Sequence, residues 1–347
     1  MADEGTLEEA YERLGETGPE FEGWLSNHGP MAAEAMVRHG HSKRVHTWLD
    51  AYNKRLEERP RGTYPIGPTD WQLALGDPKR LGDWLGYFSR EVEDHPWREV
   101  LATWWPRLVP GIAAGATHGV IRTGHVVHHL LKHDVPTGRA ELGQALGYWA
   151  ARWQRVPNAV RPNGRLTPAQ ALANVPRVPE QEQGINHRLT QLRDLSGWTA
   201  SLDSLRSALT PDEARDRIAE VANAASKRYL TTAQGSPIML VHAATAPTAV
   251  LRTLPAIPRE QWAASLDAAW AASAAVTAAY APAIPADRDD LPAADGTPDE
   301  IFARAVEHGD EHVIKLADTC LDVYARTGDA DVLASVVRAT QLTDPLS

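Results

Sequence analysis

Apolar residues recur at intervals of three and four along most of this chain, and Pro- and Gly-containing turns separate the periodic segments. This spacing is typical of amphipathic helices, and no segment shows a convincing alternation of the kind expected for half-buried strands. The sequence also has no repeat of fixed period. We therefore predict an all-α fold, a single large multi-helix domain over residues 1–347 with a flexible linker at residues 282–298.

The predicted helices begin at local signals. Pro211 fits the first helical position after the N-cap Thr210, and a short helix should start at Thr167. Pro30 likewise fits an early position of a helix that follows His28. The longer predicted helices cover residues 6–16, 32–38, 42–58, 97–108, 139–155, 183–208, 211–229, 259–281 and 330–340, with two short helices between 70 and 89.

Residues 307–315 are the first stretch with candidate chemistry. If this stretch is helical, His308, His312 and Lys315 lie along one face because they are three and four residues apart. An apolar stripe continues to Tyr324 and turns that face inward. A buried lysine needs a lowered pKa, a paired carboxylate or a chemical modification. Two surface histidines beside a solvated lysine are the alternative.

Other histidines also lie in apolar segments. His28 sits at a helix start, where it is either a ligand or a simple cap. His118 lies among small residues that permit close helix packing, and His125 returns to nearly the same face seven residues later. His118 is the better ligand candidate, and we expect His125 to support the site from behind the ligands. His242 follows four apolar residues, so it should be buried, either as a ligand or as a hydrogen-bonded core residue.

The composition argues against several classes of protein. Acidic residues number 45 and basic residues 35, which gives a net charge of −10, and no long basic run is present, so we expect no nucleic-acid binding. No apolar run reaches the ~20 residues of a membrane span, and the opening residues lack a secretory signal pattern. Cys320 is the single cysteine, which excludes an intrachain disulfide and a cysteine-rich zinc site. We expect a cytoplasmic protein.

Familiar catalytic motifs are missing from the sequence. It has no nucleophile elbow, no phosphate-binding or dinucleotide-binding glycine loop, and no His-Glu-x-x-His zinc motif. The paired Glu-x-x-His motifs of di-iron bundles are also missing. What is left is a set of single histidines on separate apolar segments.

Four stretches give the chain a resemblance to the questin oxidase family. They are residues 27–30 (Asn-His-Gly-Pro), residues 118–125 (His-Gly-Val-Ile-Arg-Thr-Gly-His), His242 with residues 245–247 (Thr-Ala-Pro), and residues 310–315 (Asp-Glu-His-Val-Ile-Lys). They follow the order of the family across most of the chain. The resemblance implies a helical oxygenase of polyketide metabolism that acts on anthraquinone-type substrates. It also implies a metal site at the centre of the helical domain, a non-haem iron held by four histidines and a carboxylated lysine.

The resemblance assigns a role to each matching position. His28, His118, His242 and His312 are the expected histidine ligands, and Lys315 is the lysine whose amine carries a carbamate derived from CO2. A carbamate turns a costly buried cation into an anionic oxygen ligand, and imidazole with carboxylate suits Fe(II). The predicted reaction is the oxidation or cleavage of a ring of an aromatic polyketide by O2.

Further expectations concern the substrate side. Arg122 could orient a phenolate, and His125 could hydrogen-bond a ligand or relay a proton. We also expect aromatic side chains to wall the pocket, such as Trp24, Tyr64, Trp104 and Trp105. Two alternatives stay open from the sequence: a metal-free helical binding or scaffold protein, and a zinc-type hydrolytic enzyme.

Overall fold

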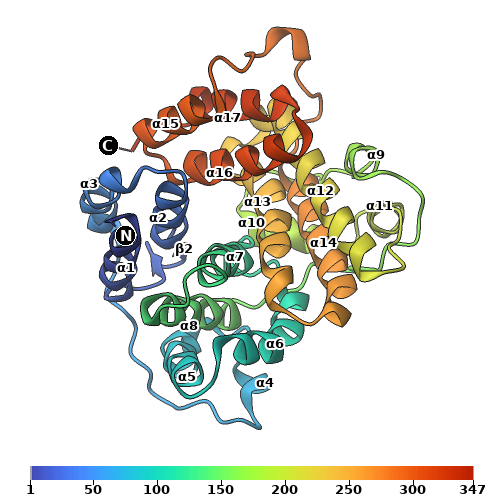
Figure 1. The fold of residues 1–347 in the computed structure, drawn as a ribbon. Helices are drawn as coiled ribbons and strands as arrows, with labels where there is room; N and C mark the ends of the chain where they lie inside the picture. The colour runs from blue at the N-terminus through green and yellow to red at the C-terminus, as the bar shows by residue number, and fades with distance from the viewer. Residues whose placement is uncertain (1, 347) are drawn as a thin grey trace. The chain divides into compact units, whose positions relative to one another are not determined.

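The computed structural model describes residues 2–346, and helices form most of this part of the chain (Figure 1). Within it the only sheet is a pair of two-residue antiparallel strands, β1 (Glu20–Phe21) and β2 (Leu25–Ser26). The predicted all-α fold is confirmed. Contacts between Cα atoms gather the chain into two compact units: unit 1 holds residues 2–155 and 252–258, and unit 2 holds residues 156–251 and 259–346. A single domain over residues 1–347 stays a prediction.

Unit 1 contains eight α-helices in the described residues, and α1, α2, α7 and α8 pack together around the inner face of α7. Helix α7 packs against both α2 and α8, and α1 also packs against α2 and α8 (Figure 1). The inner face of α7 therefore lies in the interior of this group. The bounds are α1 (Ala2–Gly15), α2 (Gly29–Arg38), α3 (Ser42–Tyr52), α4 (Trp71–Ala74), α5 (Leu81–Asp94), α6 (Trp97–Leu108), α7 (His118–Leu130) and α8 (Pro136–Ala151).

Small residues bring the helices of unit 1 close together. A Cβ atom on Gly119 would lie 2.6 Å from the ring of Trp149, so only glycine lets α7 approach α8 this closely. Trp84, Phe88 and Trp104 form an aromatic cluster beside these helices, with Phe88 and Trp104 ring centroids 4.8 Å apart. All three side chains are fully buried. They anchor α5 against α6 through apolar burial and edge-to-face contacts.

Unit 2 is organised around a long central helix. Helix α12 packs against α9, α14, α16 and α17, and α16 packs against α15 and α17. The Ser273 hydroxyl donates to the Ala243 carbonyl over 2.7 Å and joins α14 to α13. The bounds are α9 (Pro168–Ala173), α10 (Ile185–Gln191), α11 (Trp198–Asp203), α12 (Pro211–Thr232), α13 (Pro237–Thr253), α14 (Trp262–Tyr280), α15 (Pro298–His308), α16 (Glu311–Thr327) and α17 (Ala330–Leu342). Among residues 2–346, no helix is both long and apolar enough to cross a membrane.

The local start signals hold, whereas several predicted helix lengths are wrong. Thr167 forms a capping box at α9, and the Thr210 hydroxyl accepts a hydrogen bond at the start of α12. The helix predicted over 42–58 ends at Tyr52. The helix predicted over 183–208 is divided into α10 and α11, because Gly197 takes a left-handed conformation with φ of 78°. Residues 282–298 contain one short 3-10 turn, and their predicted flexibility stays a prediction.

Candidate metal-binding histidine pairs

His28 and His118 form a buried pair in unit 1. His28 occupies the N-cap position of α2, and His118 is the first residue of α7. Their ring centroids lie 4.4 Å apart with the rings nearly perpendicular, and the two residues are 5% and 6% exposed. Two positive charges this close would repel strongly, so the geometry favours neutral imidazoles, the form that binds metals.

The neighbours of His28 hold it in place through the backbone. Its backbone N–H donates to the hydroxyl of Tyr52 over 2.6 Å, and the Asn27 carboxamide oxygen accepts from the N–H of Gly29 over 2.9 Å. A Cβ atom on Gly29 would lie 2.4 Å from the side chain of Leu14, so α1 approaches this turn closely. Asn27 and Gly29 thus have structural roles beside the histidine.

The turn before His118 has an unusual backbone. Gly115, Ala116 and Thr117 have φ values of 51°, 56° and 73°, all in the left-handed region. Such a conformation costs a non-glycine residue roughly 1–2 kcal/mol and is often found at functional sites. The turn places the Gly115 carbonyl oxygen 2.5 Å from Nδ1 of His118. Because a carbonyl only accepts, Nδ1 carries the hydrogen and the lone pair lies on Nε2.

His242 and His312 form a second buried pair, in unit 2. They lie on α13 and α16, with ring centroids 5.8 Å apart, and are 0% and 8% exposed. Nδ1 of His242 donates to the Met239 carbonyl oxygen over 3.0 Å, which again leaves the lone pair on Nε2. Burial, followed by the charges of Lys315 and His312, lowers the pKa of His242 well below 6.5. The imidazole of His242 is therefore neutral at pH 7.

The predicted common face of His308, His312 and Lys315 is wrong. Gly309 has a φ of 82° and ends α15 at His308, and Asp310 begins α16 as its N-cap. Glycine favours a left-handed stop and aspartate a helix start, so the pair separates two helices. His312 and Lys315 still share α16, one turn apart.

Asp310 fixes the first turn of α16. Its Oδ1 atom accepts from the backbone N–H groups of His312 and Val313 over 2.9 and 3.0 Å. Burial raises the pKa of Asp310, but its hydrogen bonds and the charge of His312 outweigh burial and lower the pKa overall. His308 has a separate role, because its Nε2 lies 3.1 Å from the carbonyl oxygen of Thr343 and donates to it.

Lys315 is fully buried within unit 2. Its side chain is 0% exposed, and burial lowers its pKa to about 7, although Glu311 and Asp310 act in the opposite direction. An exposed lysine has a pKa near 10.4 and is almost fully protonated at pH 7. Lys315 therefore presents an amine with a substantial unprotonated fraction at neutral pH.

Arg122 lies in the interior of unit 1 and is already paired. Its Nε and Nη2 atoms donate to the two carboxylate oxygens of Glu141 over 2.5 and 2.7 Å. Burial disfavours the charge, but Glu141 outweighs burial and raises the pKa of Arg122. Among the described residues, Nη1 of Arg122 and the hydroxyl of Tyr11 are buried without a hydrogen-bond partner. Because Glu141 balances the guanidinium, the expected role of Arg122 toward a phenolate stays a prediction.

Glu34 is a site residue that sequence reasoning missed. It lies on α2 and is 3% exposed, and its carboxylate lies 2.7 Å from Nδ1 of His125 and 2.9 Å from Nδ1 of His128. Its sequence neighbours are alanines and Met36, so a lone carboxylate in an apolar helix was the available signal. Charged residues are rarely buried unless they are paired. The same signal applies to Glu141.

The aromatic residues expected to wall a pocket occupy two different settings. Trp24 and Tyr64 are 53% and 65% exposed, whereas Trp104 and Trp105 are fully buried in unit 1. Trp105 packs edge-on against Trp149 with ring centroids 5.5 Å apart. Trp104 and Trp105 therefore pack in the core of unit 1, and the expected pocket wall stays a prediction.

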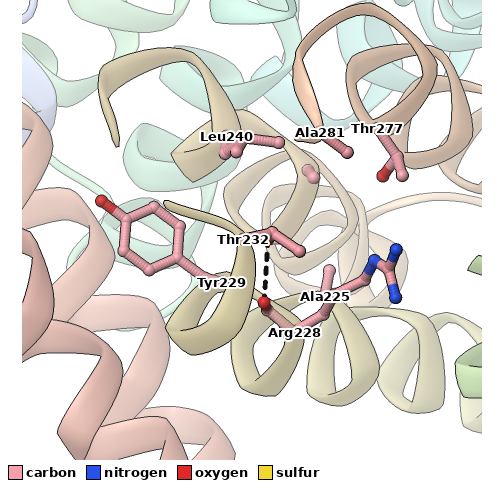
Figure 2. A pocket seen from close by; sticks show the side chains of 8 residues that line it. Ala225, Arg228, Tyr229, Thr232, Leu240, Thr277 and Ala281 are labelled. Carbon is pink, nitrogen blue, oxygen red and sulfur yellow. Dashed lines mark hydrogen bonds between the residues drawn. The ribbon is translucent and has the colours of Figure 1, made fainter. Parts of the chain in front are cut away.

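Figure 2 shows a small cavity inside unit 2, between α12, α13 and α14. Its volume of 10 Å³ has room for about one water molecule, so it cannot hold an aromatic ring. Arg228 lies beside it, and burial lowers the pKa of that guanidinium. The Thr232 hydroxyl donates to the Arg228 carbonyl oxygen over 2.8 Å. None of the predicted site residues lines this cavity.

The structure thus assembles the predicted residues into two histidine pairs, one in each unit, with Lys315 in unit 2 and Arg122 and His125 in unit 1. Comparison with protein-family models and with curated proteins found no match for the chain. The resemblance to questin oxidases therefore rests on the four quoted stretches alone.

Proposed function

We propose that this chain is a non-haem iron-dependent oxygenase that oxidises or cleaves a ring of an aromatic polyketide of the anthraquinone type. The observation that carries the proposal is the tautomer of His118 and His242. Each donates Nδ1–H to a backbone carbonyl three residues before it, so each has its lone pair on Nε2. Histidines that bind metals almost always donate their other ring N–H to such a group.

As the resemblance implies, the proposed nitrogen ligands of the iron are His28, His118, His242 and His312. The burial of all four rings supports this assignment, because a buried imidazole needs a partner. Imidazole nitrogen with a carboxylate oxygen is a donor set that suits iron. When bound, the iron would supply the redox chemistry through which O2 reacts with the ring.

Lys315 is proposed to supply the oxygen ligand as a carbamate. The unprotonated amine attacks CO2: a new N–C bond forms as one C=O π bond opens onto oxygen, and one proton leaves the nitrogen for water, which gives an anionic N-carboxylate. A pKa of about 7 provides the unprotonated amine that this step needs. A protonated lysine has no lone pair and cannot bind a metal. The anionic product also removes the cost of a buried cation.

The other polar residues of unit 1 are proposed to act on the substrate. His125 accepts a hydrogen bond or a proton from a substrate hydroxyl. Arg122, fixed by Glu141, keeps α7 and α8 in register, and its Nη1 is buried without a hydrogen-bond partner. The binding of an aromatic ring by apolar side chains with a few placed polar groups is typical of small-molecule sites.

Metal analysis tests the proposal. Protein purified with supplied iron should contain one iron per chain, and His118→Ala and His242→Ala should each lose most of it. His95→Ala is the matched control, because His95 is exposed and should leave the iron content unchanged. The absence of any stoichiometric transition metal would overturn the proposal in favour of a metal-free binding or scaffold protein. Zinc in place of iron would support the hydrolytic alternative.

A further inference from the structure

Glu34 is a buried carboxylate that contacts two histidines of the neighbouring helix. Its Oε2 lies 2.7 Å from Nδ1 of His125, and its Oε1 lies 2.9 Å from Nδ1 of His128. The two histidines are one turn apart on α7, so both rings reach the same carboxylate across the packing of α2 on α7. The side chain of His125 is 4% exposed and that of His128 is 17% exposed.

The chemistry of the carboxylate decides where the ring hydrogens lie. An ionised carboxylate accepts hydrogen bonds and donates none. Both Nδ1 atoms must therefore carry hydrogen, and in the neutral rings both Nε2 atoms carry the lone pair. Glu141 is engaged at both oxygens by Arg122, so it does not compete for these histidines.

We propose that Glu34 is a positioning residue that holds His125 and His128 in the Nδ1–H tautomer and keeps Nε2 of His125 as a proton acceptor. Nothing in the chain sequence assigns this role, because Glu34 and His125 are 91 residues apart. A carboxylate that fixes the tautomer and orientation of a histidine is a recurring device for tuning imidazole basicity. In the packing of α2 on α7, the single carboxylate of Glu34 contacts two histidines in this way.

The use of this acceptor rests on the proposed function. His125 lies seven residues after His118 and so shares nearly the same face of α7. His125 is about 10 Å along the axis of α7 from His118, so it is a phenol or hydroquinone hydroxyl bound beside His125 that would pass its proton from oxygen to Nε2 of that histidine. The products are a phenolate and an imidazolium, and the carboxylate of Glu34 balances the new positive charge. The substrate class is therefore an electron-rich ring with an acidic hydroxyl.

Histidine tautomers can be read by nitrogen-15 NMR on metal-free, histidine-labelled protein. In the unaltered chain, His125 and His128 should both show a protonated Nδ1 and an unprotonated Nε2. Glu34→Gln is nearly isosteric, but its amide offers one acceptor oxygen and one donor nitrogen. One of the two rings, and not both, should switch to the Nε2–H tautomer. Glu34→Ala should release both rings to a mixture of tautomers.

Two results would overturn the proposal: an Nε2–H tautomer for either ring in the unaltered chain, or unchanged tautomers for both rings in Glu34→Gln. A purely mechanical contact between α2 and α7 predicts no tautomer switch. Glu141→Gln is the matched control and should leave both tautomers as they are. The tautomers of His118 should also persist in every Glu34 variant, because its Nδ1 bonds the Gly115 carbonyl. Since no metal is present, failure here and failure of the iron proposal are distinguishable.

Discussion

The histidine pairs of the two units use the same residue type but lie in different electrostatic settings. In unit 1, which holds His28 and His118, the buried charged side chains have partners. Arg122 meets both oxygens of Glu141, and Glu34 meets His125 and His128. Paired buried charges of this kind fix geometry, because breaking an ion pair leaves a costly unpaired charge.

In unit 2, His242 and His312 lie beside Lys315, whose burial is only partly offset. Glu311 and Asp310 favour the ammonium, but desolvation outweighs them and lowers the lysine pKa to about 7. A group whose pKa is shifted this far by burial is a functional-site candidate. Unit 1 thus holds paired buried charges, whereas unit 2 holds a buried amine whose pKa is lowered toward neutrality.

Removing the amine of Lys315 should have the largest effect on stability and on its dependence on pH. In metal-free, CO2-depleted protein the folded pKa is about 7 and the unfolded value is 10.5. Between these pH values the unfolded chain binds a proton that the folded chain does not, so stability rises with pH across this window, by up to ~5 kcal/mol. Lys315→Met should lack this rise and should be the more stable protein at pH 7.

Urea unfolding from pH 7 to pH 9.5 measures this difference directly, because both proteins share every other titrating group. The pKa of His242 is lowered from 6.5. Its titration therefore reduces the free energy of unfolding only as the pH falls below 6.5, which is outside this window. If the free energy of unfolding rose equally with pH in the two proteins, Lys315 would not have a lowered pKa in the folded protein.

Breaking the ion pair of Arg122 should have the next largest effect. Arg122→Met leaves the carboxylate of Glu141 buried without its partner, which typically costs about 3–5 kcal/mol of unfolding free energy. The double variant Arg122→Met with Glu141→Leu removes both charges and should recover most of that loss. Urea midpoints at pH 7 compare the two.

The exposed pair of Arg139 and Asp134 offers a matched control in the same unit. Its side chains are 42% and 51% exposed, so Arg139→Met should change stability by less than ~1 kcal/mol. A loss in Arg122→Met no larger than in this control would show that unit 1 does not depend on charge matching.

The sequence was informative at helix starts that a proline or a capping side chain decides. The start of α2 beside Pro30, the capping box at Thr167 and the cap at Thr210 were all predictable, because each depends on side chains within three or four positions. Apolar periodicity likewise predicted the helical class. The inward placement of Lys315 followed from its position on the apolar stripe of α16.

What could not be predicted depends on partners distant in the chain. Glu34 meets His125 across 91 positions, and no periodicity in α2 specifies which imidazole its carboxylate will contact. The left-handed turn before His118 depends on how closely Tyr148 approaches Gly115. The helix break at Gly309 was a misjudged signal, since the spacing of the histidines suggested a continuous helix. Tertiary packing decides such features, whereas local propensity decides helix starts.

The smallest predicted effect concerns how each pair is anchored at its helix start. In unit 2 the side chain of Asp310 caps α16 at His312, whereas the N-cap position of α2 is His28, which has no side-chain cap bond. Asp310→Ala should cost about 1 kcal/mol, and Asp310→Asn should recover most of it because its carboxamide oxygen can still accept. Thr297→Ala, at the cap of α15, is the matched control.

Hydrogen exchange separates the local effect of the α16 cap from a general loss of stability. The amide groups of His312 and Val313 donate to Asp310, so they should exchange faster in Asp310→Ala and at the original rate in Asp310→Asn. Thr297→Ala should cost similar stability and leave these two amides unchanged, because stability is lost locally at each helix start. Equal acceleration in both alanine variants would mean that the first turn of α16 opens only with the whole of unit 2. His312 would then be positioned by helix packing, as His28 is by its close contacts in unit 1, and the two pairs would no longer differ in how they are anchored.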